Sequence, residues 1–110
     1  MAMPQRTFLV LLALKDEPLY GYALRKKVLI LSRGRLELEP GGLYRLIARL
    51  QGDGLVEAAP KPPSDTSADT RRRYYQLTPP GHDALREEAV RLTELAALSE
   101  VRTLAGGRGR

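Results

Sequence analysis

The chain has 110 residues, enough for one domain of ordinary size, and carries 18 Lys and Arg against 13 Asp and Glu, a net charge of +5. Its 43% hydrophobic and 28% charged residues exclude a disordered or collagen-like protein. The absence of cysteine excludes disulfides, zinc ribbons, iron–sulfur clusters and thiol catalysis, and makes the cytoplasm the expected compartment. The longest apolar run, Phe8 to Leu14, is too short to span a membrane, and the amino-terminal residues lack a cleavage site, so we expect no membrane segment and no signal peptide.

The positive charge is distributed unevenly along the chain. Residues 1–77 carry 13 basic and 8 acidic side chains, whereas residues 78–105 carry 3 basic and 5 acidic ones. A basic body followed by an acidic segment suggests that the body faces a polyanion and that the segment has another task. Charge alone does not decide this, because many small basic proteins bind nothing acidic.

The first third of the chain predicts two helices and a short strand. The run from Phe8 to Leu14 is apolar on every side, and its Leu and Ala residues favour a helix from about Pro4 to Lys15, covered on most of its surface. A second helix is predicted from Tyr20 to Leu31, because its apolar residues recur on one stripe. Residues 35–38 alternate between polar and apolar types, which indicates one short strand.

A third helix is predicted from Leu43 to Gln51, with Pro40 placed before it at an N1-like position. Its apolar residues recur at i, i+3, i+4 and i+7, which predicts a buried face made of Leu43, Leu46, Ile47 and Leu50. The opposite face is small, aromatic or basic and should stay exposed. It consists of Gly41, Gly42, Tyr44, Arg45, Ala48 and Arg49.

Two strands with a long polar connection follow the third helix. Residues 55–59 and 71–77 read as the strands of a hairpin, and residues 60–70 have the composition of a mobile loop. Side chains alternate along a strand, so we expect one of Tyr74 and Tyr75 to be buried and the other exposed. The same alternation means that Arg71, Arg72 and Arg73 cannot all point the same way.

The last segment predicts one long helix. Thr78 is a suitable N-cap and Pro79 a suitable first residue, and the apolar pattern continues to about Leu104. The five residues 106–110 are Gly and Arg only and should form a disordered basic tail.

This order of elements predicts a mostly α protein with a small β-hairpin, namely a winged helix-turn-helix over residues 1–78 and a dimerisation helix over residues 79–105. In that fold the third helix enters the major groove of DNA and the hairpin, or wing, contacts the adjacent backbone or minor groove. Arginines can form forked contacts with guanine or grip phosphate, and small residues let the backbone approach it. The predicted DNA contacts are Gly41, Gly42, Tyr44, Arg45, Arg49, Lys61, Arg71, Arg72 and Arg73, with Arg6 as a lesser candidate.

Dimerisation follows from the apolar surface that one copy leaves uncovered. A winged domain of this size closes on itself, so little of the chain remains to cover the last helix or the all-round apolar first helix. Packing the last helix of one copy on the first helix of another would cover both, and a two-fold dimer would present two recognition helices. The predicted dimer contacts are Phe8, Leu12, Leu85, Leu92, Leu95 and Leu98.

Three motifs in the expected order also resemble the PadR family of bacterial transcriptional regulators. Residues 20–24, Tyr-Gly-Tyr-Ala-Leu, are similar to its Gly-Tyr signature. Residues 40–50 followed by 52–56 resemble its recognition helix and turn, and residues 74–78 with Gly81 resemble its second wing strand and the start of its final helix. The final helix is single and short, as in the smaller PadR subfamily.

The resemblance implies a homodimeric repressor that binds a palindromic operator and is relieved by a small-molecule effector. The family pattern usually has Thr or Ser where this chain has Gly42, so one hydroxyl that could contact phosphate is missing. Some relatives are thought to stack flat aromatic ligands on tryptophan at the dimer interface. This chain has no Trp and one Phe, so an aromatic clamp of that kind is missing.

Two other function classes are weighed against DNA binding. A winged-helix protein-interaction module without specific DNA binding would need no cluster of arginines on its recognition helix and wing. An enzyme is not expected, because no nucleophile and base pattern is present and His82 is the only histidine. We therefore predict no catalytic residues, no metal site and no cofactor.

Overall fold

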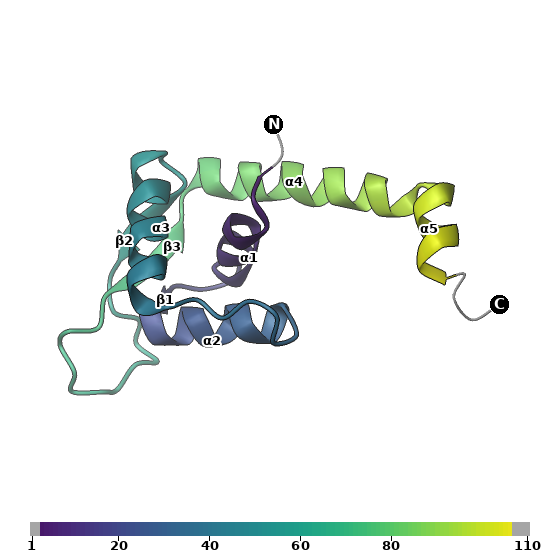
Figure 1. The fold of residues 1–110 in the computed structure, drawn as a ribbon. Helices are drawn as coiled ribbons and strands as arrows, with labels where there is room; N and C mark the ends of the chain where they lie inside the picture. The colour runs from purple at the N-terminus through teal and green to yellow at the C-terminus, as the bar shows by residue number, and fades with distance from the viewer. Residues whose placement is uncertain (1–2, 107–110) are drawn as a thin grey trace.

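The computed structural model describes residues 3–106 and is mostly helical, with one small antiparallel sheet (Figure 1). Its elements are α1 (Gln5–Ala13), β1 (Leu19–Tyr20), α2 (Gly21–Leu31), α3 (Pro40–Gly52), β2 (Val56–Ala59), β3 (Tyr74–Leu77), α4 (Pro79–Ala97) and α5 (Ser99–Gly106). The predicted class, a winged helix-turn-helix followed by a carboxyl-terminal helical segment, is confirmed. No helix within the described residues is long and apolar enough to cross a membrane.

The sheet differs from the prediction in its first strand. β3 lies in the middle, with β2 on one side and β1 on the other, and Leu19 and Tyr20 pair with Tyr75 and Tyr74. The strand predicted over residues 35–38 is wrong, because this segment forms no strand. Its alternation has another cause: Leu38 is buried in the core, and the Leu38 carbonyl accepts a hydrogen bond of 2.8 Å from Arg25 Nε.

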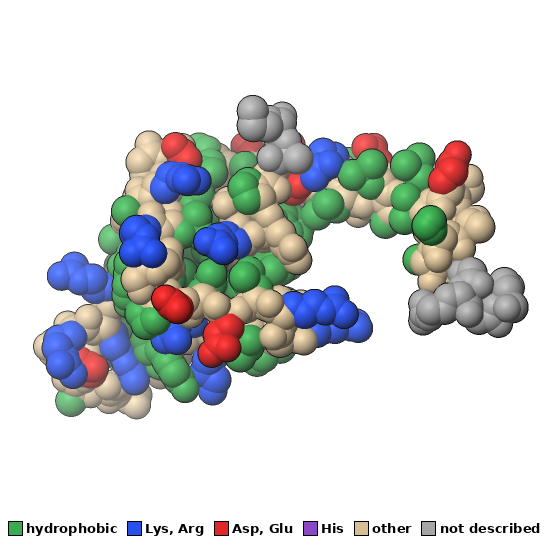
Figure 2. Space-filling model, viewed as in Figure 1, with side chains coloured by type: hydrophobic (Ala, Val, Ile, Leu, Met, Phe, Trp, Pro, Cys, Tyr) green, Lys and Arg blue, Asp and Glu red, His purple; other side chains and the backbone are tan. Residues whose placement is uncertain are grey.

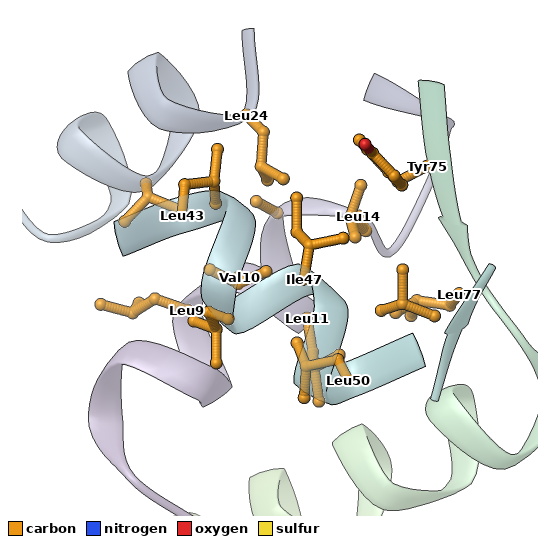
Figure 3. Packing of buried hydrophobic residues seen from close by; sticks show 14 of the residues in the cluster. Leu9, Val10, Leu11, Leu14, Leu24, Leu43, Ile47, Leu50, Tyr75 and Leu77 are labelled. Atoms are coloured by element: carbon orange, nitrogen blue, oxygen red, sulfur yellow. The ribbon is translucent and has the colours of Figure 1, made fainter. Parts of the chain in front are cut away.

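The core gathers on the inner face of α3. Leu43, Leu46, Ile47 and Leu50 are all buried, as the periodicity predicted, and they contact side chains of α1, α2 and the sheet (Figure 3). Pro40 begins the helix, where its missing N–H costs no hydrogen bond. With one face fixed in this way, the remaining side chains of α3 must face solvent.

Thr78 joins the sheet to α4 and caps the helix as predicted. Its hydroxyl oxygen accepts from the backbone N–H of Gly81 at 3.0 Å, and its O–H donates to the carbonyl of Gly54 at 2.5 Å. Leu85, one turn further, is only 4% exposed and belongs to the core of its own chain. The prediction that Leu85 contacts a second copy is therefore wrong, since the first turns of α4 still pack on the body.

The predicted single last helix is also wrong, because the chain turns at Leu98. Leu98 has φ −59° and ψ 133°, which ends α4, and α5 starts at Ser99 and runs across its direction (Figure 1). The Leu98 carbonyl accepts from the backbone N–H of Arg102 at 3.0 Å, so Leu98 caps the new helix. Glu100 in the first turn of α5 suits the positive end of its dipole. Gly106 ends α5, and the rest of the predicted tail, residues 107–110, lies outside the described residues.

Candidate nucleic-acid interface

The solvent-exposed face of α3 carries the side chains that were predicted from the sequence to contact DNA. Tyr44, Arg45 and Arg49 are exposed, Gly41 is exposed and Gly42 is half-buried in the first turn. Figure 2 shows Lys and Arg side chains over α3 and around the wing, on the left of the view. The structure thus brings the predicted helix contacts together on one accessible surface.

Arg45 lies across the first turn of α3 because both glycines leave room for it. A Cβ at Gly41 would lie 3.3 Å from Arg45 Nη1, and a Cβ at Gly42 would lie 3.9 Å from Arg45 Nη2. Arg6, from the first turn of α1, joins Arg45 and Arg49 around one hollow of about 450 Å³. Sequence reasoning gave Arg6 a minor place, because 39 positions separate it from Arg45 and only the fold brings them together. The result is a concentrated positive surface at the start of α3.

Tyr44 connects α3 with the start of α2. A Cβ at Gly21 would lie 2.3 Å from the Tyr44 hydroxyl oxygen, so a side chain at this position would displace the Tyr44 ring. The same two residues line a hollow of about 520 Å³ together with the wing residues Arg71, Arg72 and Arg73. Tyr44 therefore bridges the surface of α3 and the base of the wing.

The three wing arginines are placed differently. The side chain of Arg71 is 90% exposed and Arg73 is exposed, whereas the side chain of Arg72 is only 31% exposed. Arg72 lies over the ring of Tyr20, with 4.2 Å from its guanidinium carbon to the ring centroid, and Arg72 Nη1 is 3.3 Å from Asp65 Oδ1. Lys61 also points into the wing, where its ammonium donates to the carbonyl of Ser67.

Both wing tyrosines are buried, which corrects the prediction that one would be exposed. Tyr75 faces the core, and Tyr74, on the opposite face of β3, packs its ring against Tyr20 at 5.5 Å between centroids. The Tyr74 hydroxyl donates to Asp65 Oδ2 at 2.6 Å. The polar loop contacts this second face of the sheet through Asp65.

The acid dependence of the wing follows from Asp65. The hydrogen bond from Tyr74 first, then the Ser67 N–H and the charges of Lys61 and Arg72, lower the pKa of the Asp65 carboxyl below its usual 3.8. A lowered folded-state pKa means that the stabilisation is present above the usual value and is lost as pH falls through the lowered one. In an NMR titration we expect the Asp65 carboxyl carbon and the Ser67 amide to titrate together, with a midpoint below 3.8. A midpoint at or above that value would contradict these contacts.

A second surface of the molecule is apolar. Beyond the body, α4 and α5 expose six large apolar side chains, between 37% and 73% of each being accessible. They are Val90, Leu92, Leu95, Leu98, Val101 and Leu104. The predicted Leu92, Leu95 and Leu98 belong to this surface, whereas Phe8 and Leu12 on α1 are only partly buried against the core.

The comparison with protein families decides the class of this protein. The model of the transcriptional regulator PadR-like family matches residues 10–87, which includes the helix-turn-helix, the wing and the start of α4. The chain belongs to the PadR-like family of transcriptional regulators. Members of this family are regulators rather than enzymes, in agreement with the sequence prediction.

Curated relatives match the PadR-like chain over only part of their length. It is 39% identical over 88 residues to an uncharacterized 37.1 kDa protein in transposon Tn4556 of Streptomyces fradiae, covering 80% of this chain and 23% of that protein. It is 40% identical over 67 residues to the transcriptional regulator Rv3488 of Mycobacterium tuberculosis, covering 60% and 58% of the two chains. The chain thus spans about a quarter of the first relative and somewhat over half of the second.

Solved PadR-like structures share the fold. A PadR-like regulator from Bacillus cereus superposes with a TM-score of 0.73 and 25% identity over 94% of this chain and 93% of that one. A PadR-like transcription factor from Bacteroides fragilis has a TM-score of 0.63 and 30% identity, with 82% of each chain covered.

Proposed function

We propose that this PadR-like chain is a homodimeric, sequence-specific DNA-binding repressor that reads a palindromic operator with α3 and grips the flanking backbone with its wing. The observation that carries the proposal is the division of α3 into two faces. Its four leucine and isoleucine side chains are all buried in the core, and Arg45 and Arg49 are exposed on the same side as two glycines. A recognition helix needs this combination of rigid support and free donors.

The contacts divide by chemistry. Arg45 and Arg49 have forked guanidinium groups that match the O6 and N7 acceptors of guanine in the major groove. Arg6, Arg71 and Arg73 lie at the edges of the surface and would neutralise phosphates, which positions the protein without reading sequence. Tyr44, between the two groups, would donate its hydroxyl to a phosphate.

The dimer is proposed to form through the part of residues 79–105 that extends beyond the body. A row of exposed apolar side chains on α4 and α5 marks an association surface, because monomers rarely leave such patches open. A two-fold axis there would present two α3 helices to half-sites roughly 34–36 Å apart. The small-molecule effector that the resemblance implies belongs to the same proposal, and it can be screened once an operator is known.

Charges placed on the apolar surface should dissociate the dimer. We expect a Leu95→Asp/Leu98→Asp variant to sediment as a folded monomer in analytical ultracentrifugation, because two carboxylates would be buried without partners. His82→Asp adds one charge to the exposed first turn of α4 and should remain dimeric. Dimers of unchanged stability in the double variant would place the interface elsewhere.

The proposed function is tested by titrating labelled DNA from upstream of the protein's own gene, with fluorescence anisotropy over a salt series. Tight, salt-sensitive binding that exceeds binding to random DNA supports a sequence-specific regulator. Weak binding that is equal for all sequences would show that the target lies elsewhere. No binding even at low salt would overturn the proposal and favour a protein-interaction module.

A further inference from the structure

We propose that Arg72 is a positioning residue of the wing rather than a DNA contact, and that it acts through a lock formed with Tyr20, Asp65 and Tyr74. We call these four residues the wing lock. The inference rests on the proposed DNA binding, and it gives the three adjacent wing arginines two separate tasks. Arg71 and Arg73 would contact DNA, and Arg72 would hold the loop that carries them.

The carboxylate of Asp65 is the centre of the wing lock. Its side chain is only 3% exposed, and an unpaired carboxylate so buried would be costly. It accepts hydrogen bonds from the Tyr74 hydroxyl at 2.6 Å, the Ser67 backbone N–H at 2.8 Å and Arg72 Nη1 at 3.3 Å. Removing one partner leaves the carboxylate partly unsatisfied, so the members of such a network depend on one another.

The wing lock joins the wing to β1, which is far from it in the sequence. Asp65 and Arg72 lie in the loop, Tyr74 begins β3, and Tyr20 belongs to β1 beside the start of α2. The Arg72 guanidinium stacks on Tyr20 at 4.2 Å, and the rings of Tyr20 and Tyr74 pack at 5.5 Å. Residues 60–70 contain no apolar side chain larger than Ala apart from prolines, so these polar contacts fix where the loop lies.

Arg72 and its two neighbours differ in exposure. Arg72 is held against Tyr20, whereas Arg71, in the turn that precedes β3, and Arg73 are exposed. A wing ordered before binding also avoids the entropy cost of ordering it on DNA. Releasing the lock should therefore weaken DNA binding without removing a phosphate contact.

Two aspartates of the same loop give the decisive comparison. Asp65→Asn and Asp69→Asn each remove one negative charge from the wing, so electrostatics alone predicts tighter DNA binding for both. Asp69 pairs with the exposed Arg71 at 3.2 Å and lies outside the wing lock. We expect Asp69→Asn to bind DNA as tightly as the natural chain or tighter, and Asp65→Asn to bind about tenfold more weakly, the cost of ordering several side chains. Tighter binding by both variants would overturn the proposal.

The salt dependence of binding separates positioning from contact. When a phosphate contact is lost, the negative slope of log K against log salt concentration becomes less steep by about one. When a residue that only orders the wing is lost, the affinity falls and the slope stays the same. We expect Arg71→Gln to make the salt dependence less steep, and Arg72→Gln to lower the affinity while the salt dependence keeps its steepness. An Arg72→Gln variant with the reduced slope of Arg71→Gln would make Arg72 a DNA contact.

Hydrogen exchange in the free protein tests the lock without DNA. Tyr74→Phe keeps the ring and the charge and removes only the O–H donor to Asp65. We expect it to accelerate exchange of the Ser67 amide severalfold, with Asp69→Asn as the unchanged control. Unchanged exchange in Tyr74→Phe would overturn the lock, whereas accelerated exchange in a chain that binds no DNA would leave the lock standing and remove the proposed function.

Discussion

An Arg45→Ala/Arg49→Ala variant is expected to lose sequence-specific DNA binding while keeping its fold. Both side chains are exposed on α3 and take no part in the core, so their removal should leave the thermal unfolding midpoint nearly unchanged. Each base-reading arginine is worth about 1–3 kcal/mol, so the double variant should lose roughly 2–6 kcal/mol per half-site. Anisotropy titrations against specific and random DNA would measure both the lost affinity and the lost preference.

Arg86→Ala is the matched control for this variant. Arg86 is exposed on α4, where its side chain pairs with Asp83 at 3.4 Å, and it is not among the residues that line the α3 hollow. Its removal changes the net charge by the same amount per substitution, so it reports the general electrostatic effect. Equal losses of affinity per charge removed in Arg86→Ala and in the Arg45→Ala/Arg49→Ala variant would show that Arg45 and Arg49 contribute only net charge.

Gly81→Ala is expected to cause the largest loss of stability among the glycine positions described. A Cβ at this position would lie 2.0 Å from the Leu55 carbonyl oxygen, and backbone at both places would have to move. The same carbonyl accepts from the backbone N–H of Thr78 at 3.1 Å, so α4 cannot shift without disturbing its own start. We expect the free energy of unfolding to fall by about 3 kcal/mol, measured by urea denaturation at fixed protein concentration.

Gly52→Ala makes the same chemical change but is expected to stabilise the protein. Gly52 is the last residue of α3, and a Cβ there would meet nothing within 4 Å. Alanine should raise the free energy of unfolding by roughly 0.4–1 kcal/mol by restricting the unfolded chain. Equal stability of the two variants would contradict the close packing of α4 on the α3–β2 turn.

The sequence predicts the part of this fold that local periodicity controls. The apolar spacing of α3 and the cap at Thr78 appear within a few neighbouring residues, so the buried and exposed faces of the helix could be read directly. β1 could not, because a strand of two residues exists only through its pairing with β3, more than fifty positions later. The turn at Leu98 could not be predicted either, because leucine is a good helix former and the neighbouring residues include no glycine or proline.

In the candidate site, too, features set by neighbouring residues could be predicted, and features set by distant residues could not. Alternation predicted that the three wing arginines could not point together, but which one turns inward depends on Tyr20 and Asp65, which only the fold brings near Arg72. The apolar pattern of the last helix predicts Leu85 on the dimer surface, together with Leu92 and Leu95. The stripe crosses from the body into solvent along α4, and a sequence pattern does not show where a helix leaves its own core.

The central claim, that α3 reads bases in the major groove, is tested most directly by methylation interference on the operator. Dimethyl sulfate modifies guanine N7, the major-groove atom that Arg45 and Arg49 would contact. The proposal predicts that methylated guanines in two half-sites, roughly 10 base pairs apart, block binding of the natural chain. It also predicts that this interference disappears in the Arg45→Ala/Arg49→Ala variant. Binding that is indifferent to guanine N7 methylation, or blocked only by modifications in the minor groove, would contradict the assignment of α3 as the recognition helix.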